Sequence, residues 1–267
     1  MKVVLFCGGL GTRIRDEAEN LPKPMVTVGY RPILWHVMRY YAYHGHKDFI
    51  LCLGYKADVI KRYFLEYDET VSNDFVLAGT DRSVSLVRSD IQDWRITFVD
   101  TGMGSNIGQR LRAVSRHLEG EAMFLANYAD GVSDLPLPAM IEAFRASDAV
   151  ASFVSVRPTG SFHVVSHDGR NMVTAIGHVG DSPFRINGGF FVFRPAILDE
   201  VRPGEELVEH PFQRLIAAGK LVTYPYDGFW ACMDTFKERQ LLEDMHARGD
   251  TPWMPWRKLN GSSLGKP

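Results

Sequence analysis

The sequence predicts an α/β fold, with a doubly wound, mostly parallel mixed sheet and helices on both of its faces. Two observations support this prediction. Short apolar runs alternate with segments of helical periodicity between residues 3 and 156, which is typical of parallel sheets whose crossovers are helices. The chain also has 267 residues, of which 45% are hydrophobic, so it can bury a large core without disulfides or structural metal.

The first half supplies most of the expected sheet. Residues 32–44 form the clearest helix, because Pro32 suits a first helical position and Gly45 ends the apolar pattern. Residues 68–94 combine turn formers with weak strand patterns, which indicates a ribbon outside the core. The other expected strands are 3–7, 49–53, 95–99, 122–126 and 149–156, and the other expected helices are 58–67, 108–118 and 136–146.

The second half differs in character and is richer in β-structure. A hairpin is expected over residues 162–176, around the turn formers at 167–170. The remaining expected elements are strands 190–193 and 221–226 and helices 211–218 and 235–248. Residues 257–267 are expected to form a flexible tail, because the chain is rich in glycine and serine from Asn260 onward.

Composition excludes several classes of protein. The formal net charge is -2 and no long basic run occurs, so the charge pattern of a nucleic-acid binder is absent. No apolar stretch approaches the ~20 residues of a membrane-spanning helix. The three cysteines, Cys7, Cys52 and Cys232, are an odd number without paired spacing, which argues against a disulfide framework and favours a cytoplasmic location.

The strongest local signal is the segment 8–13, which reads GGLGTR after the first strand. Glycines let the backbone turn sharply and let its N–H groups approach phosphates closely, and Arg13 adds a planar cation that can hold two phosphate oxygens. A plain strand-to-helix turn would also explain the glycines. The spacing fits neither the dinucleotide fingerprint nor the P-loop, because those require G-x-G-x-x-G and a lysine after the last glycine.

Two further charged groups lie near strand ends. Lys23 stands between Pro22 and Pro24, which stiffen the backbone on either side of it, although an exposed lysine is the common alternative. Asp130 follows the strand at 122–126. Parallel sheets bind ligands beyond the carboxyl ends of their strands, so we expect the Gly8 segment and Asp130 at the same edge.

Together, GGLGTR at 8–13 and PKPM at 22–25 resemble the signature of the sugar-1-phosphate nucleotidylyltransferase family. The resemblance continues over residues 1–256 and is closest to one branch, the glucose-1-phosphate cytidylyltransferases. The strings that carry it are PILWH at 32–36, GYK at 54–56, VDTG at 99–102, DGV at 130–132, INGGFF at 186–191, GFW at 228–230 and MDT at 233–235.

The resemblance implies a Rossmann-like nucleotidylyltransferase domain over residues 1–256. Residues 1–135 would hold the nucleotide, and residues 136–256, with a small β-rich appendage, would hold the sugar. It implies a homo-oligomer that takes a nucleoside triphosphate, with CTP favoured, and a sugar 1-phosphate, with glucose 1-phosphate favoured.

The resemblance also implies roles for single residues. Arg13 and Lys23 would neutralise the triphosphate as catalytic groups, and Asp130 and Asp234 would hold Mg²⁺. The residues implied to bind the nucleotide are Gly8, Gly9, Gly11, Thr12 and Arg110. The sugar phosphate oxygen would then attack the α-phosphorus in line without a general base, because it is already ionised at neutral pH.

The sugar side departs from the family pattern. A Glu-Lys-Pro string usually precedes the Asn-Gly-Gly string, but residues 177–179 here read GHV, and residues 160–163 read GSFH in place of Gly-Arg-Phe-Gly. His178 is therefore expected at the sugar phosphate with Asn187 and Gly188, although its charge is partial near pH 7. Arg185 is a second candidate cation, and His178 as an exposed residue without a role is the plain alternative. These changes raise the hypothesis that the acceptor is not plain glucose 1-phosphate.

Three other functions stay open at this point. The same chemistry with dTTP, UTP or GTP and a different sugar phosphate is one of them. A nucleotide-binding protein without catalysis is the second, although the presence of Arg13, Lys23, Asp130 and Asp234 argues against it. A Rossmann oxidoreductase is the third, and the wrong glycine spacing disfavours it.

Overall fold

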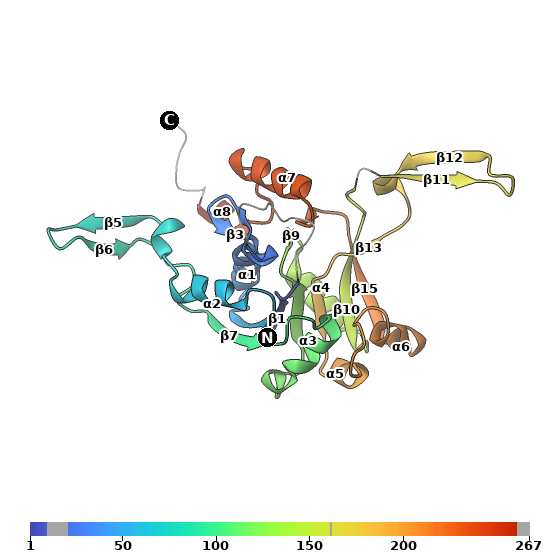
Figure 1. Cartoon of the computed structure of the whole chain (residues 1–267), viewed down its shortest axis with the longest axis horizontal. Coiled ribbons are helices and arrows are strands. Elements are labelled where there is room, and N and C mark those ends of the chain that lie inside the picture. Colours follow the sequence, from blue (N-terminus) through green and yellow to red (C-terminus); the bar gives the residue numbers. More distant parts are fainter. Residues whose placement is uncertain (10–20, 161, 261–267) are drawn as a thin grey trace.

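The computed structural model describes residues 1–9, 21–160 and 162–260. These residues form an eight-stranded sheet in the order β13-β10-β14-β8-β1-β4-β7, with β15 paired to β10 (Figure 1). The strands are β1 (Lys2–Phe6), β4 (Asp48–Leu53), β7 (Arg95–Asp100), β8 (Phe124–Tyr128), β10 (Ala151–Val156), β13 (Ile186–Asn187), β14 (Phe191–Phe193) and β15 (Leu221–Tyr226). The predicted α/β class is confirmed.

The sheet is parallel around its first strand and mixed beyond it. β1 pairs in parallel with β4 and β8, β4 pairs in parallel with β7, and β10 pairs in parallel with β15. β14 runs antiparallel to both β8 and β10. The parallel strands β1 and β8 therefore end at one edge, where Gly8 and Asp130 follow them, as the sequence predicts.

Alternating side chains of the strands enter two separate cores. Val3 and Leu5 of β1 belong to one cluster of buried residues, and Val4 and Phe6 belong to the other. The first core is covered by α1 (Ile33–Tyr43), α2 (Ala57–Leu65), α4 (Leu137–Arg145), α7 (Phe236–Ala247) and α8 (Pro255–Asn260). The second is covered by α3 (Ile107–Ala113), α5 (Ile197–Glu200) and α6 (Pro211–Ala217). Helices on both faces are thus confirmed.

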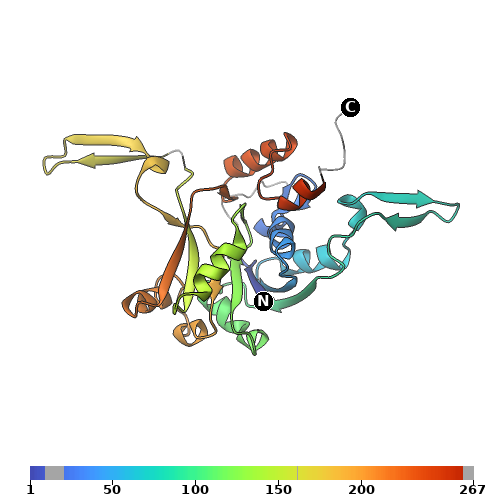
Figure 2. The same cartoon turned by 180° about the vertical axis from the view of Figure 1, so that it is seen from behind.

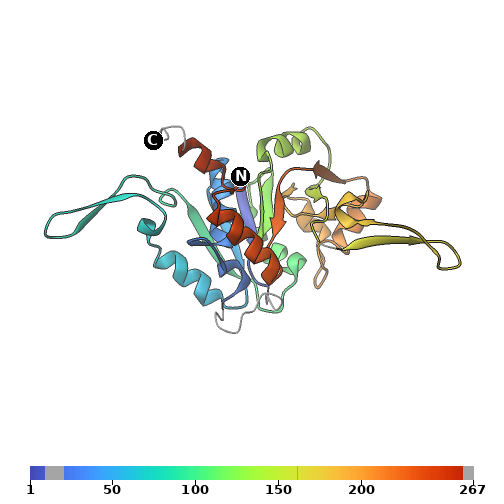
Figure 3. The same cartoon turned by 90° about the horizontal axis from the view of Figure 1, so that it is seen from above.

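Two hairpins project from opposite ends of the molecule (Figures 1, 2 and 3). One consists of β5 (Phe75–Ala78) and β6 (Ser83–Leu86) and fulfils the prediction of a ribbon within residues 68–94. The other consists of β11 (His163–His167) and β12 (Val173–His178), where the sequence predicts a hairpin. Both carry exposed apolar side chains, among them Leu77 and Ile176.

Most expected elements appear with ends shifted by one or two residues. The expected helix 108–118 is an exception, because it divides into α3 and a 3₁₀ turn, Ser115–Leu118. α3 begins after Asn106, whose side chain accepts a hydrogen bond from the Gln109 N–H in a capping box. Within the described residues, no helix has both the length and the apolar composition needed to cross a membrane.

Two short strand pairs and two short helices were not predicted. β2 (Thr27–Val28) pairs with β3 (Arg31–Pro32), after a 3₁₀ turn over Lys23–Met25. β9 (Gly131–Ser133) pairs with β16 (Trp230–Cys232), so that Cys232 lies opposite Gly131. Strands of two or three residues are too short for a periodic signal, and the same holds for helices as short as α5 and α8.

The link between β8 and the Asn-Gly-Gly segment gives a first prediction. Gly189 has a φ of +76°, and a Cβ there would lie 2.4 Å from Asn127 Oδ1, which accepts the Phe190 N–H. Gly189→Ala should lower the free energy of unfolding by more than ~2 kcal/mol, since it adds a collision to the strain of a positive φ.

Gly219→Ala is the matched control, because Gly219 has a φ of +66° with no atom within 4 Å of the added Cβ among the described residues. It should lower the unfolding free energy by only about 1 kcal/mol. Urea denaturation of the two variants measures the difference, and equal losses would contradict the proposed collision with Asn127.

Candidate active site

A cavity of about 480 Å³ opens at the edge where β1 and β8 end. Among the residues that line it are six that the sequence analysis singled out: Gly8, Gly9, Lys23, Arg110, Asp130 and Asp234. They come from five separate stretches of the chain. The structure therefore assembles most of the expected nucleotide side into one concave surface of the size that small-molecule sites have.

Lys23 lies at the centre of this group. Its ammonium nitrogen contacts both Asp130 Oδ2 and Asp234 Oδ1. The Lys23 side chain is only 14% exposed, and those of Asp130 and Asp234 are 20% and 34% exposed. One ammonium is thus shared by two carboxylates, which leaves this partly buried group with a net negative charge.

Three local features bring these side chains together. The Pro22 and Pro24 rings flank Lys23 at the start of a 3₁₀ turn, whose first backbone hydrogen bond joins Met25 N–H to Pro22 C=O at 2.8 Å. Asp130 stands between β8 and β9. The pairing of β9 with β16 is continued by a bond from Met233 N–H to Asp130 C=O at 3.0 Å, which brings Asp234 beside Asp130.

Burial and charge act in opposite directions on these groups. Burial alone would lower the pKa of Lys23, but the neighbouring Asp130 and Asp234 carboxylates raise it above its ordinary value. Burial also raises the pKa of Asp130, against the opposing effect of the Lys23 ammonium. The Lys23 ammonium consequently stays charged near neutral pH.

Arg110 has a packing role that the sequence did not indicate. Its guanidinium donates to the backbone C=O of Gly8 at 3.1 Å and of Leu53 at 3.0 Å, and to Thr101 Oγ1 at 2.7 Å. A Cβ on Gly8 would lie 2.0 Å from Arg110 Nη1. Glycine at position 8 is therefore needed so that the buried arginine can hold the end of β1 in place.

The three residues expected at the sugar phosphate fall into two groups. Asn187 lies near the cavity wall, because its Nδ2 is 3.4 Å from the hydroxyl of Tyr128, which lines the cavity. Gly188 follows it, and its C=O accepts the Trp230 indole N–H at 2.8 Å. His178 lies instead at the exposed base of the β11–β12 hairpin, where its ring faces that of His163.

Arg185, the second candidate cation, is engaged elsewhere. It donates to Asp227 Oδ1 at 2.7 Å and to the C=O of Ser155 at 2.9 Å. This pairing makes it a brace between β10 and the segment after β15. Gly11, Thr12 and Arg13 lie outside the described residues, so the structure says nothing of their expected roles.

Several lining residues were missed by sequence reasoning. Tyr128 and Phe6 are the last residues of β8 and β1, and their rings lie 6.3 Å apart at the cavity. Asn106 and Glu206 also line it. The terminal position on a parallel strand could have indicated the two aromatic residues, but nothing in the sequence indicates Glu206.

The donor set fits a divalent metal ion that shares its shell with a phosphate ligand. Within residues 1–9, 21–160 and 162–260, no three His, Cys, Asp or Glu side chains gather as a complete metal site. Asp130 and Asp234 nevertheless both contact the Lys23 ammonium. In phosphoryl-transfer sites Mg²⁺ takes one or two carboxylates and completes its shell with phosphates and water. Two carboxylates around a lysine ammonium are consistent with that pattern.

The chain is similar in sequence and in fold to known nucleotidyl transferases. Residues 2–235 match the family model described as nucleotidyl transferase. The chain is 37% identical to the glucose-1-phosphate cytidylyltransferase of Salmonella typhimurium and 36% identical to that of Salmonella typhi, over 96% of this chain and 100% of either relative. A solved UDP-glucose pyrophosphorylase in complex with UDP-glucose has the same fold, with a TM-score of 0.67, 14% identity and coverage of 93% and 98%.

The shared cation site gives a second prediction. Lys23→Met removes the ammonium and leaves Asp130 and Asp234 facing each other, so the variant should lose roughly 2 kcal/mol of stability in EDTA. Millimolar Mg²⁺ should restore part of this loss, because the ion can replace the missing charge. Thermal unfolding with and without Mg²⁺ measures both effects.

Lys47→Met is the control, since Lys47 pairs with a single aspartate, Asp93, and the two side chains are 41% and 62% exposed. Its stability should change by less than ~0.5 kcal/mol. If Mg²⁺ stabilised Lys23→Met no more than the wild type, the two carboxylates would not form a joint cation site.

Proposed function

The chain belongs to the nucleotidyl transferase family, and from this premise we propose that it makes CDP-glucose and pyrophosphate from CTP and glucose 1-phosphate. The observation that carries the proposal is the similarity to glucose-1-phosphate cytidylyltransferases over 96% of the chain. The cavity with Lys23, Asp130 and Asp234 supports it, because the ammonium can neutralise phosphate charge and the two carboxylates can hold a metal ion that does the same. The enzyme is a nucleotidyltransferase of the cytidylyltransferase type.

The reaction needs orientation and charge neutralisation more than proton transfer. An oxygen of the sugar phosphate attacks the α-phosphorus of CTP and forms a new P–O bond. The bond from that phosphorus to the bridging oxygen breaks on the opposite side, and pyrophosphate leaves with the electron pair. The attacking oxygen is already anionic at neutral pH, so no residue has to act as a general base.

The residues of the cavity reduce the repulsion between the two anions. The Lys23 ammonium stays charged and is proposed to turn from the carboxylates to the phosphates. Arg13 is proposed as a second cation for the triphosphate. Members of this family typically use a divalent metal ion, and we propose Mg²⁺, held by Asp130 and Asp234. The ion would supply positive charge to the phosphate oxygens. Gly8, Gly9, Gly11 and Thr12 are proposed to bind the triphosphate, and Arg110 fixes Gly8 through a hydrogen bond to its C=O.

The acceptor side is proposed to use His178, Asn187 and Gly188. Asn187 is the last residue of β13 and Gly188 follows it. They lie beside Tyr128 and Trp230, near the cavity wall. His178 is exposed on a projecting hairpin, so a contact with the sugar phosphate would need the acceptor to bridge the cavity and that hairpin.

Turnover with defined substrates gives the third prediction. Pyrophosphate release with Mg²⁺ should be fastest for CTP with glucose 1-phosphate, when CTP, UTP, dTTP, GTP and ATP are each combined with several sugar 1-phosphates. Asp130→Asn should lower kcat by at least about 100-fold, since it removes one of the two carboxylates proposed to hold the metal ion that stabilises the transition state. Release confined to another pair would overturn the assignment of substrates, and release from none would overturn catalysis.

The acceptor contact gives the fourth prediction. His178→Lys should lower the KM for glucose 1-phosphate by several-fold at pH 7.5, because a lysine ammonium brings a full positive charge to the phosphate. The KM for CTP should stay unchanged. His167→Lys is the control, as it adds the same charge to the same exposed hairpin. An equal effect of both substitutions would remove His178 from the site and leave only a general effect of charge.

A further inference from the structure

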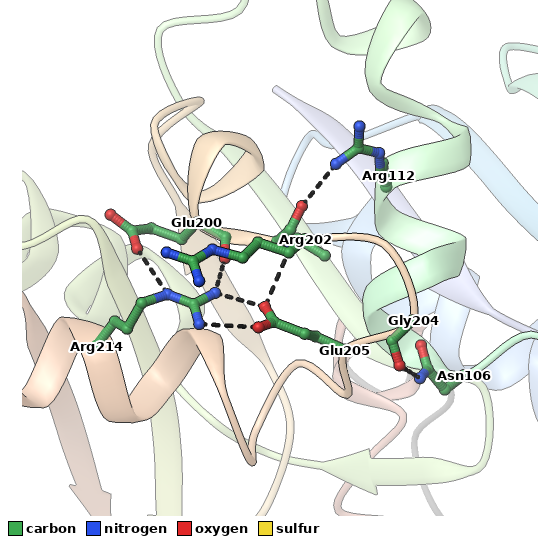
Figure 4. A network of polar contacts seen from close by, with 8 residues as sticks. Asn106, Arg112, Glu200, Arg202, Gly204, Glu205 and Arg214 are labelled. Atoms are coloured by element: carbon green, nitrogen blue, oxygen red, sulfur yellow. Dashed lines mark hydrogen bonds and ion pairs between the residues drawn. The ribbon is translucent and has the colours of Figure 1, made fainter.

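The loop between α5 and α6 is fixed against α3 by a network of charged and polar contacts (Figure 4). The Arg214 guanidinium donates to Glu205 Oε1 at 3.0 Å and to Glu200 Oε2 at 3.3 Å. Hydrogen bonds from Arg214 lower the pKa of Glu205 to about 2. Arg112 of α3 donates to the C=O of Val201 at 2.9 Å. Two arginines thus fix the loop, Arg214 from α6 and Arg112 from α3.

A second set of contacts joins the same loop to the first turn of α3. Asn106 Nδ2 donates to the C=O of Gly204 at 3.0 Å (Figure 4). Gly108 allows the close approach, because a Cβ at that position would lie 2.3 Å from the C=O oxygen of Glu205. The residue that follows, Glu206, is consequently held at one place relative to α3.

Glu206 lines the cavity that holds Lys23, Asp130 and Asp234. Its Oε2 accepts the backbone N–H of Ile107 at 3.2 Å, at the start of α3. Among the described residues, nothing donates a hydrogen bond to its other oxygen, Oε1. The side chain is half-buried, so a ligand in the cavity would meet a fixed carboxylate oxygen with spare accepting capacity.

Electrostatics limit what that ligand group can be. A carboxylate without a cation partner repels phosphate, so Glu206 cannot serve the triphosphate as Lys23 does. It favours an N–H or O–H donor. Apolar side chains of Phe6, Met103 and Ile107 line the same cavity, and they suit the face of a planar base better than a hydroxylated ribose.

Resting on the proposed function, we propose that Glu206 selects the base of the nucleotide, with Oε1 accepting a hydrogen bond from the exocyclic amino group of cytosine. A carboxylate is a good acceptor for that amino group. Uracil and thymine carry a carbonyl oxygen at the same position, which the carboxylate repels. Glu206 is therefore a specificity residue for CTP over UTP and dTTP.

Binding without the acceptor tests this directly. Calorimetric titration of the whole chain with CTP and with UTP, in Mg²⁺ and without sugar phosphate, should give the wild type a Kd for UTP about 10-fold or more above that for CTP. Glu206→Gln should reduce this ratio by about 10-fold or more, because an amide can turn its NH₂ toward the uracil oxygen. Glu209→Gln is the control: it is exposed on the same loop, does not line the cavity, and should leave the ratio unchanged.

Each other outcome contradicts base selection. No preference for CTP in the wild type would overturn it, and so would an equal loss of CTP and UTP binding in Glu206→Gln, since a contact with ribose or a role in capping α3 predicts that result. Glu206→Ala, with thermal unfolding to confirm folding, provides a second variant for the same ratio. Selective binding of CTP without pyrophosphate release would instead overturn the proposed function and leave base selection standing.

Discussion

The contact of one lysine ammonium with two carboxylates is the constraint around which the rest of the cavity is arranged. Lys23 reaches Asp234 across 211 residues of sequence, and Asp130 lies between them along the chain. Each of the three groups would be costly to desolvate alone. Their meeting requires β1 beside β8, β9 paired with β16, and a rigid turn at Lys23. The sheet order and two unpredicted short strands therefore serve the same small cluster.

The sequence predicted the sheet, its helices and both hairpins because these elements are long enough to show periodicity. Residues 33–43 and 2–6 carry clear patterns, and the structure places a helix and a strand there. The strands β9 and β16 were not predicted, since three residues are too few to show an alternating hydrophobic pattern. Yet they decide where Asp234 lies. The position of Asp234 was expected from the resemblance alone, and local patterns would have left it in a loop.

Some residues of the candidate site are indicated by local sequence patterns, and others depend on tertiary contacts. Lys23 and Asp130 stand out in the sequence, because prolines flank the lysine and a strand precedes the aspartate. Arg110 was expected at the nucleotide from the resemblance alone, and Glu206 was not expected, since their positions depend on tertiary contacts with Gly8, Leu53 and Ile107. Arg185 shows the reverse case, because a cation that looks available in the sequence is bound to Asp227 in the fold. Whether a charged side chain is available to a ligand depends on its neighbours in the fold, and the residue type alone does not predict it.

The distant origin of Asp234 also has a consequence for the newly made protein. β1, β4, β7 and β8 are complete once residue 128 has been synthesised, so these four neighbouring strands can assemble while the chain is still on the ribosome. The carboxylate pair cannot form until β16 has emerged, more than a hundred residues later. Until then Lys23 can pair only with Asp130 of the two carboxylates. A nascent chain at this stage lacks the Asp234 carboxylate in the cavity. The complete group of Lys23, Asp130 and Asp234 therefore forms only after the second half of the protein has folded against the first.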